Sequence, residues 1–144
     1  MGLSWRTVLH KRENFRSAFA GFDPGKIARF GDRDVKRLLA DAGCIRSGAK
    51  IAAAIHNAQK FLEVQREFGS FSDYQWAFVG GKPIVHKIRS AKDYPVTIPE
   101  AQAFAKDLKA RGFKFLGPTT VYAHMQAVGM VNDHTADCFR YDQV

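Results

Sequence analysis

Apolar residues recur at helical spacing along almost the whole of this chain, and glycine or proline interrupts the pattern at short intervals. The longest uninterrupted stretch is residues 47–69, whose buried face we expect to carry Ile51, Ile55, Ala58 and Leu62. No segment shows a convincing alternation of apolar and polar residues, as a half-buried strand would. Short helices separated by brief turns therefore predict an all-α fold.

Helix boundaries are indicated by proline at the start and glycine at the end of several segments. Residues 99–112 and 118–130 form two such segments, joined by a tight turn. In front of another helix, Ser72 and Gln75 have the spacing of a capping box, in which each side chain bonds the backbone N–H of the other residue. Residues 80–96 contain two prolines and a glycine pair, which indicates an irregular connection.

The length of 144 residues suits one domain with a full hydrophobic core, so we expect a single domain over residues 1–144. We find neither the apolar region of a signal peptide nor the roughly 18 consecutive apolar residues of a membrane span. Two cysteines do not suggest a disulfide framework. We therefore expect a cytoplasmic protein without membrane contact, and a monomer.

The net charge of +8 results from 22 Lys and Arg residues against 14 Asp and Glu residues. A compact domain with this surplus attracts polyanions, and nucleic acid is the commonest polyanion of the cytoplasm. Charge alone also fits a basic surface that binds nothing in particular. The choice between these two interpretations depends on the motifs of the chain.

The segment around residues 112–117 has the form of a helix-hairpin-helix motif, which spans about residues 100–130. A glycine at position 117 lets the backbone N–H groups that open the second helix approach a phosphate closely. A lysine and two threonines beside it add a cation and hydroxyl donors. The candidate DNA contacts are Gly112, Lys114, Gly117, Thr119 and Thr120. The same spacing also fits an ordinary helical hairpin with a glycine cap.

Near the C-terminus, His134 and Cys138 are four residues apart, so a helix there would place both on one face. A structural zinc site needs four ligands, and this pair supplies two. The remaining candidates, Cys44 and four histidines, are single and scattered along the sequence. Either the pair is not a metal site, or two of its ligands are missing from this chain.

Several blocks of the sequence resemble a known family. The stretch "LGPTTV" resembles the helix-hairpin-helix signature of DNA glycosylases. Three longer blocks, "GLSWRTVLHKRENFRSAFAGFDP", "LLADAGCIRSGAKIAAAIHNA" and "RGFKFLGPTTVYAHMQAVGMVNDH", resemble the DNA-3-methyladenine glycosylase I family in family order. The resemblance implies an all-α, helix-hairpin-helix glycosylase-like domain that lacks the family's N-terminal segment.

This resemblance also carries expectations for individual residues. It implies that His134 and Cys138 hold a structural zinc ion whose other two ligands belong to the missing segment. It matches Trp5 to a tryptophan that stacks on the flipped base, although Trp5 also suits the buried stripe of an amphipathic helix. The family's base-contacting Glu has no counterpart here, so the catalytic residue is unknown. Asp133 is either a weak catalytic candidate or, as we favour, a helix N-cap.

The implied activity is hydrolysis of the N-glycosidic bond of 3-methyladenine in alkylated double-stranded DNA, a step of base excision repair. Thr119 stands where related enzymes with lyase activity carry a Schiff-base lysine, which implies a monofunctional enzyme. Because the base-contacting Glu is missing, we expect this shortened chain to be strongly impaired. The alternative is a non-catalytic DNA-binding module that keeps the hairpin but not the base pocket.

Overall fold

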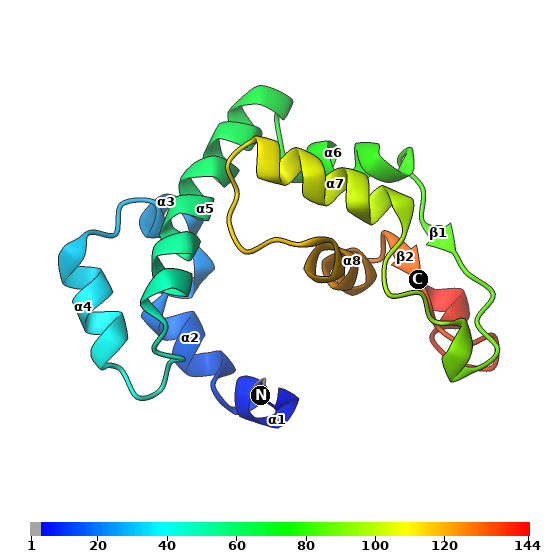
Figure 1. The fold of residues 1–144 in the computed structure, drawn as a ribbon, viewed down its shortest axis with the longest axis horizontal. Coiled ribbons are helices and arrows are strands. Elements are labelled where there is room, and N and C mark those ends of the chain that lie inside the picture. The colour runs from blue at the N-terminus through cyan, green and yellow to red at the C-terminus, as the bar shows by residue number, and fades with distance from the viewer. Residues whose placement is uncertain (1–3) are drawn as a thin grey trace. The chain divides into compact units, whose positions relative to one another are not determined.

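The computed structural model describes residues 4–144, and most of these residues are helical (Figure 1). The prediction of an all-α fold is therefore confirmed. None of the helices within residues 4–144 combines the length and the apolar character that a membrane span requires. The chain forms two compact units, which are described in turn: the first comprises the described residues up to Glu63 together with Phe113–Phe115, and the second comprises Val64–Gly112 and Leu116–Val144. The single domain over residues 1–144 stays a prediction.

The first unit is built from short helices around one apolar core. Its elements are α1 (Trp5–His10), α2 (Arg12–Ala18), the 3-10 turn η1 (Ala20–Phe22), α3 (Pro24–Ile27), α4 (Asp32–Ala40) and most of α5 (Gly48–Phe68). The core consists of Ala18, Phe19, Ile27, Leu38, Cys44, Ile51, Ile55 and Ala58. Thus α5 contributes Ile51, Ile55 and Ala58 of its predicted apolar face, and α2, α3 and α4 pack against it. The fourth predicted residue, Leu62, is only half-buried.

Local sequence signals explain where the short helices of the first unit begin. Ser4 caps α1, because its hydroxyl oxygen accepts a hydrogen bond from the amide of Thr7 at 3.2 Å. Asp23 caps α3 in the same way through the amide of Lys26 at 3.0 Å, and Pro24 occupies the first helical position. These caps fix the chain direction at both turns.

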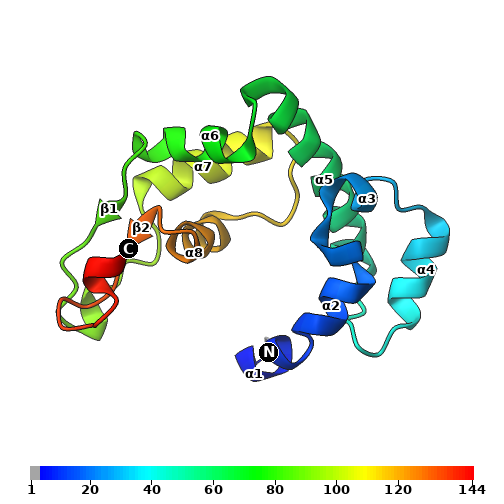
Figure 2. The same cartoon turned by 180° about the vertical axis from the view of Figure 1, so that it is seen from behind.

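The second unit contains the end of α5 followed by helices and two very short strands. Its elements are α6 (Phe71–Trp76), η2 (Ala77–Val79), β1 (Ile84–Val85), η3 (Ala91–Asp93), α7 (Pro99–Ala110), α8 (Pro118–Ala127), β2 (Val131–Asn132) and η4 (Tyr141–Gln143). Helices α7 and α8 pack against each other, as both ribbon views show (Figure 2). Phe104 of α7 and Met125 of α8 are almost fully buried.

The two strands join the irregular connection to the C-terminal segment. They pair in parallel, with Ile84 opposite Val131 and Val85 opposite Asn132, and a further bridge links Ile88 to Thr135. The sequence shows no strand here because two residues cannot display an alternating pattern. The pairing ties residues 84–88 to the segment that contains Asp133 and His134.

One predicted helix start is wrong by two residues. Helix α6 begins at Phe71 with Ser70 as its N-cap, whereas we predicted a capping box of Ser72 and Gln75. The hydroxyl of Ser70 accepts from the amide of Asp73 at 2.9 Å and donates to the carboxylate of Asp73 at 2.7 Å. Two serines in "GSFSD" offer competing caps, and only Ser70 has a carboxylate three residues later.

Within the second unit, Arg111 links the end of α5 to α7. Its guanidinium donates to Glu67 at 2.7 and 3.1 Å and to Asp107 at 2.7 Å. The same group lies over the rings of Phe68 and Tyr74, at 4.8 and 5.2 Å from their centroids. Burial acts to raise the pKa of Asp107, but the hydrogen bonds from Tyr74 and Arg111 outweigh it and lower that pKa. This cluster fixes α7 just before the hairpin.

Candidate functional site

The hairpin begins with a glycine that ends α7. The residue after the C-cap Arg111 is Gly112, which has φ 92° and donates its amide to the carbonyl of Lys109 at 3.0 Å. Only glycine adopts this left-handed conformation without strain, so Gly112 has the role of a helix cap. The interpretation of Gly112 as a cap is confirmed, and its contact with DNA stays a prediction.

The hairpin ends at the N-terminus of α8, where the residues are exposed. Gly117 is the N-cap with φ −80°, Pro118 follows, and no side-chain hydrogen bond caps this end. A side chain at Gly117 would meet no atom within 4 Å, so the described residues do not require glycine here. Thr119 and Thr120 are exposed beside it. The first amides of a helix lack partners within it, so this end can accept an anion.

The centre of the hairpin is held by a residue that the sequence did not single out. Asn57 on α5 donates its Nδ2 to the carbonyl of Lys114 at 2.9 Å, and the amide of Lys114 donates to Oδ1 of Asn57 at 2.8 Å. Lys114 and Phe115 are exposed, whereas Phe113 is buried. Phe115 has φ 61°, which is unusual for an aromatic residue.

Trp5 lies on the surface at the start of α1 and is 79% exposed. It lines a shallow hollow of about 360 Å³ together with Val8, Leu9, Arg12, Phe15 and Phe22. The interpretation of Trp5 as a core aromatic is therefore wrong, because its ring is not buried among the described residues. An exposed indole face is what stacking on a flipped base requires.

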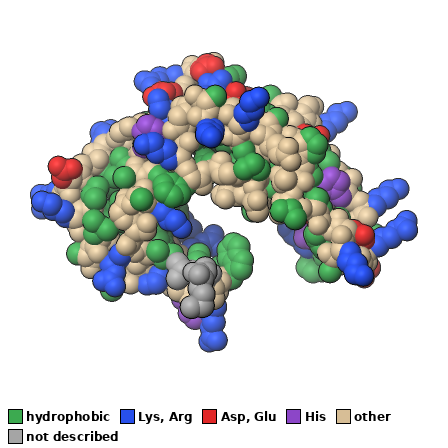
Figure 3. Space-filling model, viewed as in Figure 1, with side chains coloured by type: hydrophobic (Ala, Val, Ile, Leu, Met, Phe, Trp, Pro, Cys, Tyr) green, Lys and Arg blue, Asp and Glu red, His purple; other side chains and the backbone are tan. Residues whose placement is uncertain are grey.

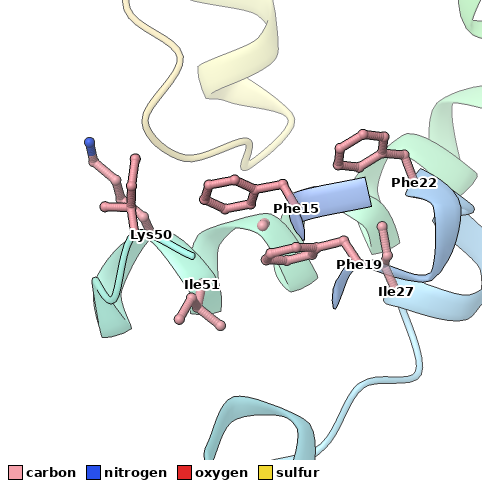
Figure 4. A pocket seen from close by; sticks show the side chains of 8 residues that line it. Phe15, Phe19, Phe22, Ile27, Lys50 and Ile51 are labelled. Carbon is pink, nitrogen blue, oxygen red and sulfur yellow. The ribbon is translucent and has the colours of Figure 1, made fainter. Parts of the chain in front are cut away.

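A second hollow of the first unit, of about 300 Å³, shares Phe15 and Phe22 with the first (Figure 4). The rings of Phe15 and Phe19 are stacked in it with centroids 5.9 Å apart. Lys50 is the one charged residue among its described lining side chains. The other described lining side chains are apolar, so this hollow offers mainly an apolar binding surface.

Asp133 is 8% exposed and accepts hydrogen bonds from three side chains. The donors are Tyr122 Oη, His86 Nδ1 at 2.6 Å and Gln126 Nε2 at 2.5 Å. Burial acts to raise the pKa of Asp133, but these three hydrogen bonds outweigh it and keep that pKa below its ordinary value. The carboxylate joins α8 to the segment that follows β1.

Our preferred interpretation of Asp133 as a helix N-cap is wrong. The amide of His134 donates instead to the side-chain oxygen of Asn132 at 3.1 Å, and residues 134–138 form a turn rather than a helix. The parallel pairing of β1 with β2 brings His86, which is distant in sequence, close to Asp133. The carboxylate of Asp133 therefore bonds side chains and not the amides of a helix N-terminus. A catalytic role for Asp133 stays a prediction, and its three donors leave it little exposed surface.

His134 and Cys138 lie close together even though they are not on a helix. The Nδ1 of His134 and the Sγ of Cys138 are 3.6 Å apart. Bond lengths of about 2.1 Å to nitrogen and 2.3 Å to sulfur at a tetrahedral angle give about the same separation, so the pair fits two corners of a zinc site. Among residues 4–144, no group of three or more His, Cys, Asp or Glu side chains is arranged to hold a metal ion.

Comparison with known proteins decides the family. The sequence profile of methyladenine glycosylases matches residues 1–141. The chain belongs to this family. It is 46% identical over 140 residues to DNA-3-methyladenine glycosylase 1 of Escherichia coli (strain K12), covering 97% of this chain and 75% of that protein. It is 44% identical over 137 residues to the Haemophilus influenzae DNA-3-methyladenine glycosylase, covering 95% and 74%.

Solved structures of methyladenine glycosylases have the same fold. A crystal structure of 3-methyladenine DNA glycosylase I superposes with a TM-score of 0.90 at 48% identity, over 96% of this chain and 76% of that one. The Staphylococcus aureus enzyme, described for its recognition of 3-methyladenine, gives a TM-score of 0.91 at 38% identity, over 96% and 73%. The predicted resemblance is confirmed, and the protein is a DNA repair glycosylase.

Each predicted site residue of this methyladenine glycosylase lies in one of the two units. Trp5 and Lys114 belong to the first unit, whereas Gly117, Asp133 and His134 belong to the second. The sequence pattern identified Lys114, Gly117 and His134, whereas Trp5 and Asp133 were identified through the resemblance to the family. It did not identify Asn57. The one sequence feature that sets this residue apart is that asparagine is a poor helix former and yet lies inside the long helix α5.

Proposed function

We propose that the protein hydrolyses the N-glycosidic bond of 3-methyladenine in alkylated double-stranded DNA. The observation that carries this proposal is the family match over residues 1–141, together with relatives of 46% and 44% identity that are named for this base. The exposed Trp5 and the exposed hairpin supply surfaces that such a reaction needs.

The base must leave the helical stack before its glycosidic bond can be reached. Methylation at N3 gives the attached base a positive charge, and Trp5 offers an exposed indole face on which a cation can lie. Water then forms a bond to C1′ while the electrons of the C1′–N9 bond pass to the base. The base leaves neutral, and the proton of the attacking water passes to solvent. A cationic leaving group therefore needs little help from a general acid.

The hairpin is proposed to hold the DNA backbone. The free helix N-terminus at Gly117, the amine of Lys114 and the hydroxyls of Thr119 and Thr120 are all exposed and suit a phosphate. Lys and Arg side chains are spread along the face shown in Figure 3, where Asp and Glu are few. Together with the net charge of +8, this distribution supports binding to duplex DNA without sequence preference.

We propose that the enzyme is monofunctional and works as a cytoplasmic monomer. A lyase step needs an amine that attacks C1′ and forms a Schiff base, and the hairpin carries Thr119 at the position where related lyases have lysine. A threonine hydroxyl cannot form that intermediate, so hydrolysis is the remaining route. Both cysteines are free thiols, which suits a reducing compartment.

We propose His134 and Cys138 as two ligands of a structural zinc ion. Their separation of 3.6 Å supports this assignment, because it fits tetrahedral coordination. Bound zinc would supply a cross-link between segments and would take no part in base release. Residues 4–144 bring no third His, Cys, Asp or Glu side chain together with this pair, so two further ligands would have to come from elsewhere.

Release of 3-methyladenine from alkylated duplex DNA tests the proposed function. Base release above spontaneous depurination, with an intact sugar–phosphate backbone, is the expected result. Strand cleavage at the abasic site would contradict a monofunctional enzyme. Salt-sensitive DNA binding without any base release would favour a non-catalytic DNA-binding module. The rate relative to that of the Escherichia coli relative tests the prediction that base release by this chain is strongly impaired.

A further inference from the structure

Two hydrogen bonds connect one side chain of α5 to one residue of the hairpin. Asn57 gives both a donor and an acceptor to the backbone of Lys114, at 2.9 and 2.8 Å. The two residues are 57 positions apart in the sequence. Because the carboxamide bonds both the N–H and the C=O of the same residue, it fixes the orientation of that residue as well as its position.

Only a carboxamide can make both of these bonds. Aspartate at position 57 would accept from the amide of Lys114, but its second oxygen would face the Lys114 carbonyl without a donor. Alanine would remove both bonds. The support behind Asn57 is rigid, because its neighbours Ile55 and Ala58 are part of the core of the first unit.

The residues beside this contact show why the hairpin needs support. Phe115 follows Lys114 directly and has φ 61°, a conformation that a non-glycine residue keeps only when its surroundings enforce it. Lys114 and Phe115 are both exposed, so their own side chains supply little packing. The contact from Asn57 and the buried Phe113 are the described features that hold this part of the turn.

We propose that Asn57 is a positioning residue for DNA binding, which holds Lys114 in its binding conformation before DNA arrives. This inference rests on the proposed function, since it assumes that Lys114 contacts the DNA backbone. A preformed contact avoids the loss of conformational freedom that ordering the loop on binding would require. Lys114 and Trp5 lie in the same compact unit, so Asn57 also ties the phosphate contact to the unit that carries the stacking residue.

Asn57→Ala tests the proposal with Gln59→Ala as the matched control. Gln59 lies on the same helix and also donates to a backbone carbonyl, that of Ala28 at 3.1 Å, but it does not touch the hairpin. We expect Asn57→Ala to weaken binding of undamaged duplex about three- to tenfold, with Gln59→Ala unchanged. Base release at saturating DNA should change less than about twofold, because the proposed role of Asn57 is in DNA binding and not in the bond-breaking step.

Two further measurements separate positioning from a general loss of stability. The Lys114 amide should exchange its hydrogen faster in Asn57→Ala, while the amides of α5 and α8 keep their protection. In a Lys114→Ala background, Asn57→Ala should have little further effect on affinity, because the contact it positions is gone. Asn57→Asp keeps the bond from the Lys114 amide and loses the bond to the Lys114 carbonyl, so it should protect that amide from exchange better than Asn57→Ala does.

The proposal is overturned if Asn57→Ala binds DNA as Gln59→Ala does, or if its loss of affinity is equally large without the Lys114 side chain. A fall in base release at saturating DNA with unchanged affinity would also overturn it. Binding of undamaged duplex and hydrogen exchange do not depend on base release. A failure of the proposed activity can therefore be distinguished from a failure of this inference.

Discussion

The two glycines of the hairpin are required for different reasons. Gly112 adopts φ 92°, which the fold needs in order to end α7. Gly117 has an ordinary φ of −80° and open space where a side chain would be, so the fold itself does not demand glycine there. Because the fold does not explain the glycine at position 117, we attribute it to the close approach of a DNA phosphate.

Substituting alanine for Gly112 and for Gly117 in turn distinguishes a role in folding from a role in DNA binding. Gly117→Ala should lower the free energy of unfolding only slightly, because alanine is a poorer N-cap than glycine, and should weaken duplex binding about tenfold, because a methyl group hinders approach to the backbone N–H groups. Gly112→Ala should lower the free energy of unfolding by about 1 kcal/mol, because alanine is strained at positive φ. Chemical denaturation and a DNA titration of both variants test this. Equal effects on stability would contradict it.

Trp5→Ala tests the stacking role. The change should slow the release of 3-methyladenine roughly 2- to 30-fold, which corresponds to the loss of about 0.5–2 kcal/mol of cation–π interaction. The free energy of unfolding should hardly change, since Trp5 is 79% exposed. Trp5→Phe keeps an aromatic face and should recover part of the rate. Single-turnover assays measure all three proteins, and an unchanged rate in Trp5→Ala would remove Trp5 from the site.

At the residue scale, the sequence predicts the types of functional side chain better than their partners. Lys114 and Gly117 are recognisable from the hairpin pattern, because the hairpin is local. The partner of Lys114 is 57 residues away, and His86 is 47 residues from Asp133. Periodicity carries no information about such pairs, so the cap assigned to Asp133 was wrong.

At the element scale, His124 connects α8 to α6. Its Nε2 lies 2.9 Å from Oε1 of Gln75. The residue as a whole is exposed, but the part of its ring that packs against α6 is shielded from water, and this desolvation lowers the pKa of His124 below its ordinary value of 6.5. The folded protein therefore prefers the neutral imidazole more strongly than the unfolded chain does. The resulting stability is present above pH 6.5 and is lost as the pH falls through the lowered pKa.

The free energy of unfolding should thus decrease from pH 7 to pH 5 more steeply in the wild type than in His124→Gln. Glutamine does not titrate in this range, so the difference between the two curves isolates His124. Denaturant unfolding at several pH values measures both. Parallel curves would show that His124 keeps its ordinary pKa.

Elements with strong local signals were predicted, and elements without them were not. Proline and glycine mark α7 and α8, although α8 ends at Ala127 rather than at Met130. The start of α6 was placed two residues late, because Ser70 and Ser72 are both possible caps. The strands β1 and β2 depend on long-range pairing and have only two residues each.

At the scale of the whole molecule, the net charge of +8 predicts a steep dependence of DNA affinity on salt. The logarithm of the binding constant should fall linearly with the logarithm of salt concentration, since each neutralised phosphate releases counterions. Lys114→Glu should weaken binding and flatten this slope by about one unit. Lys92→Glu makes the same charge change on exposed η3 and should have a smaller effect. Equal effects would point to bulk charge rather than to a hairpin contact.

Zinc binding by the 144-residue chain should be weak. Two ligands leave about half of the coordination shell to water, and residues 4–144 show no third His, Cys, Asp or Glu grouped with His134 and Cys138. Zinc should therefore be removed by dialysis against a chelator, and His134→Ala should abolish what binding there is. Metal analysis after dialysis measures this. Stoichiometric zinc that survives the chelator would reveal ligands not yet identified.

The order of the two units along the chain limits how the gene can be divided. The second unit begins at Val64, but the later residues Phe113–Phe115 belong again to the first unit. A cut after Glu63 would give an N-terminal fragment that keeps Asn57 but loses Lys114, its hydrogen-bond partner. Any continuous fragment that holds the whole first unit must also carry α6 and α7. Recombination at a single point therefore cannot exchange the unit that bears Trp5 without also exchanging half of the hairpin motif.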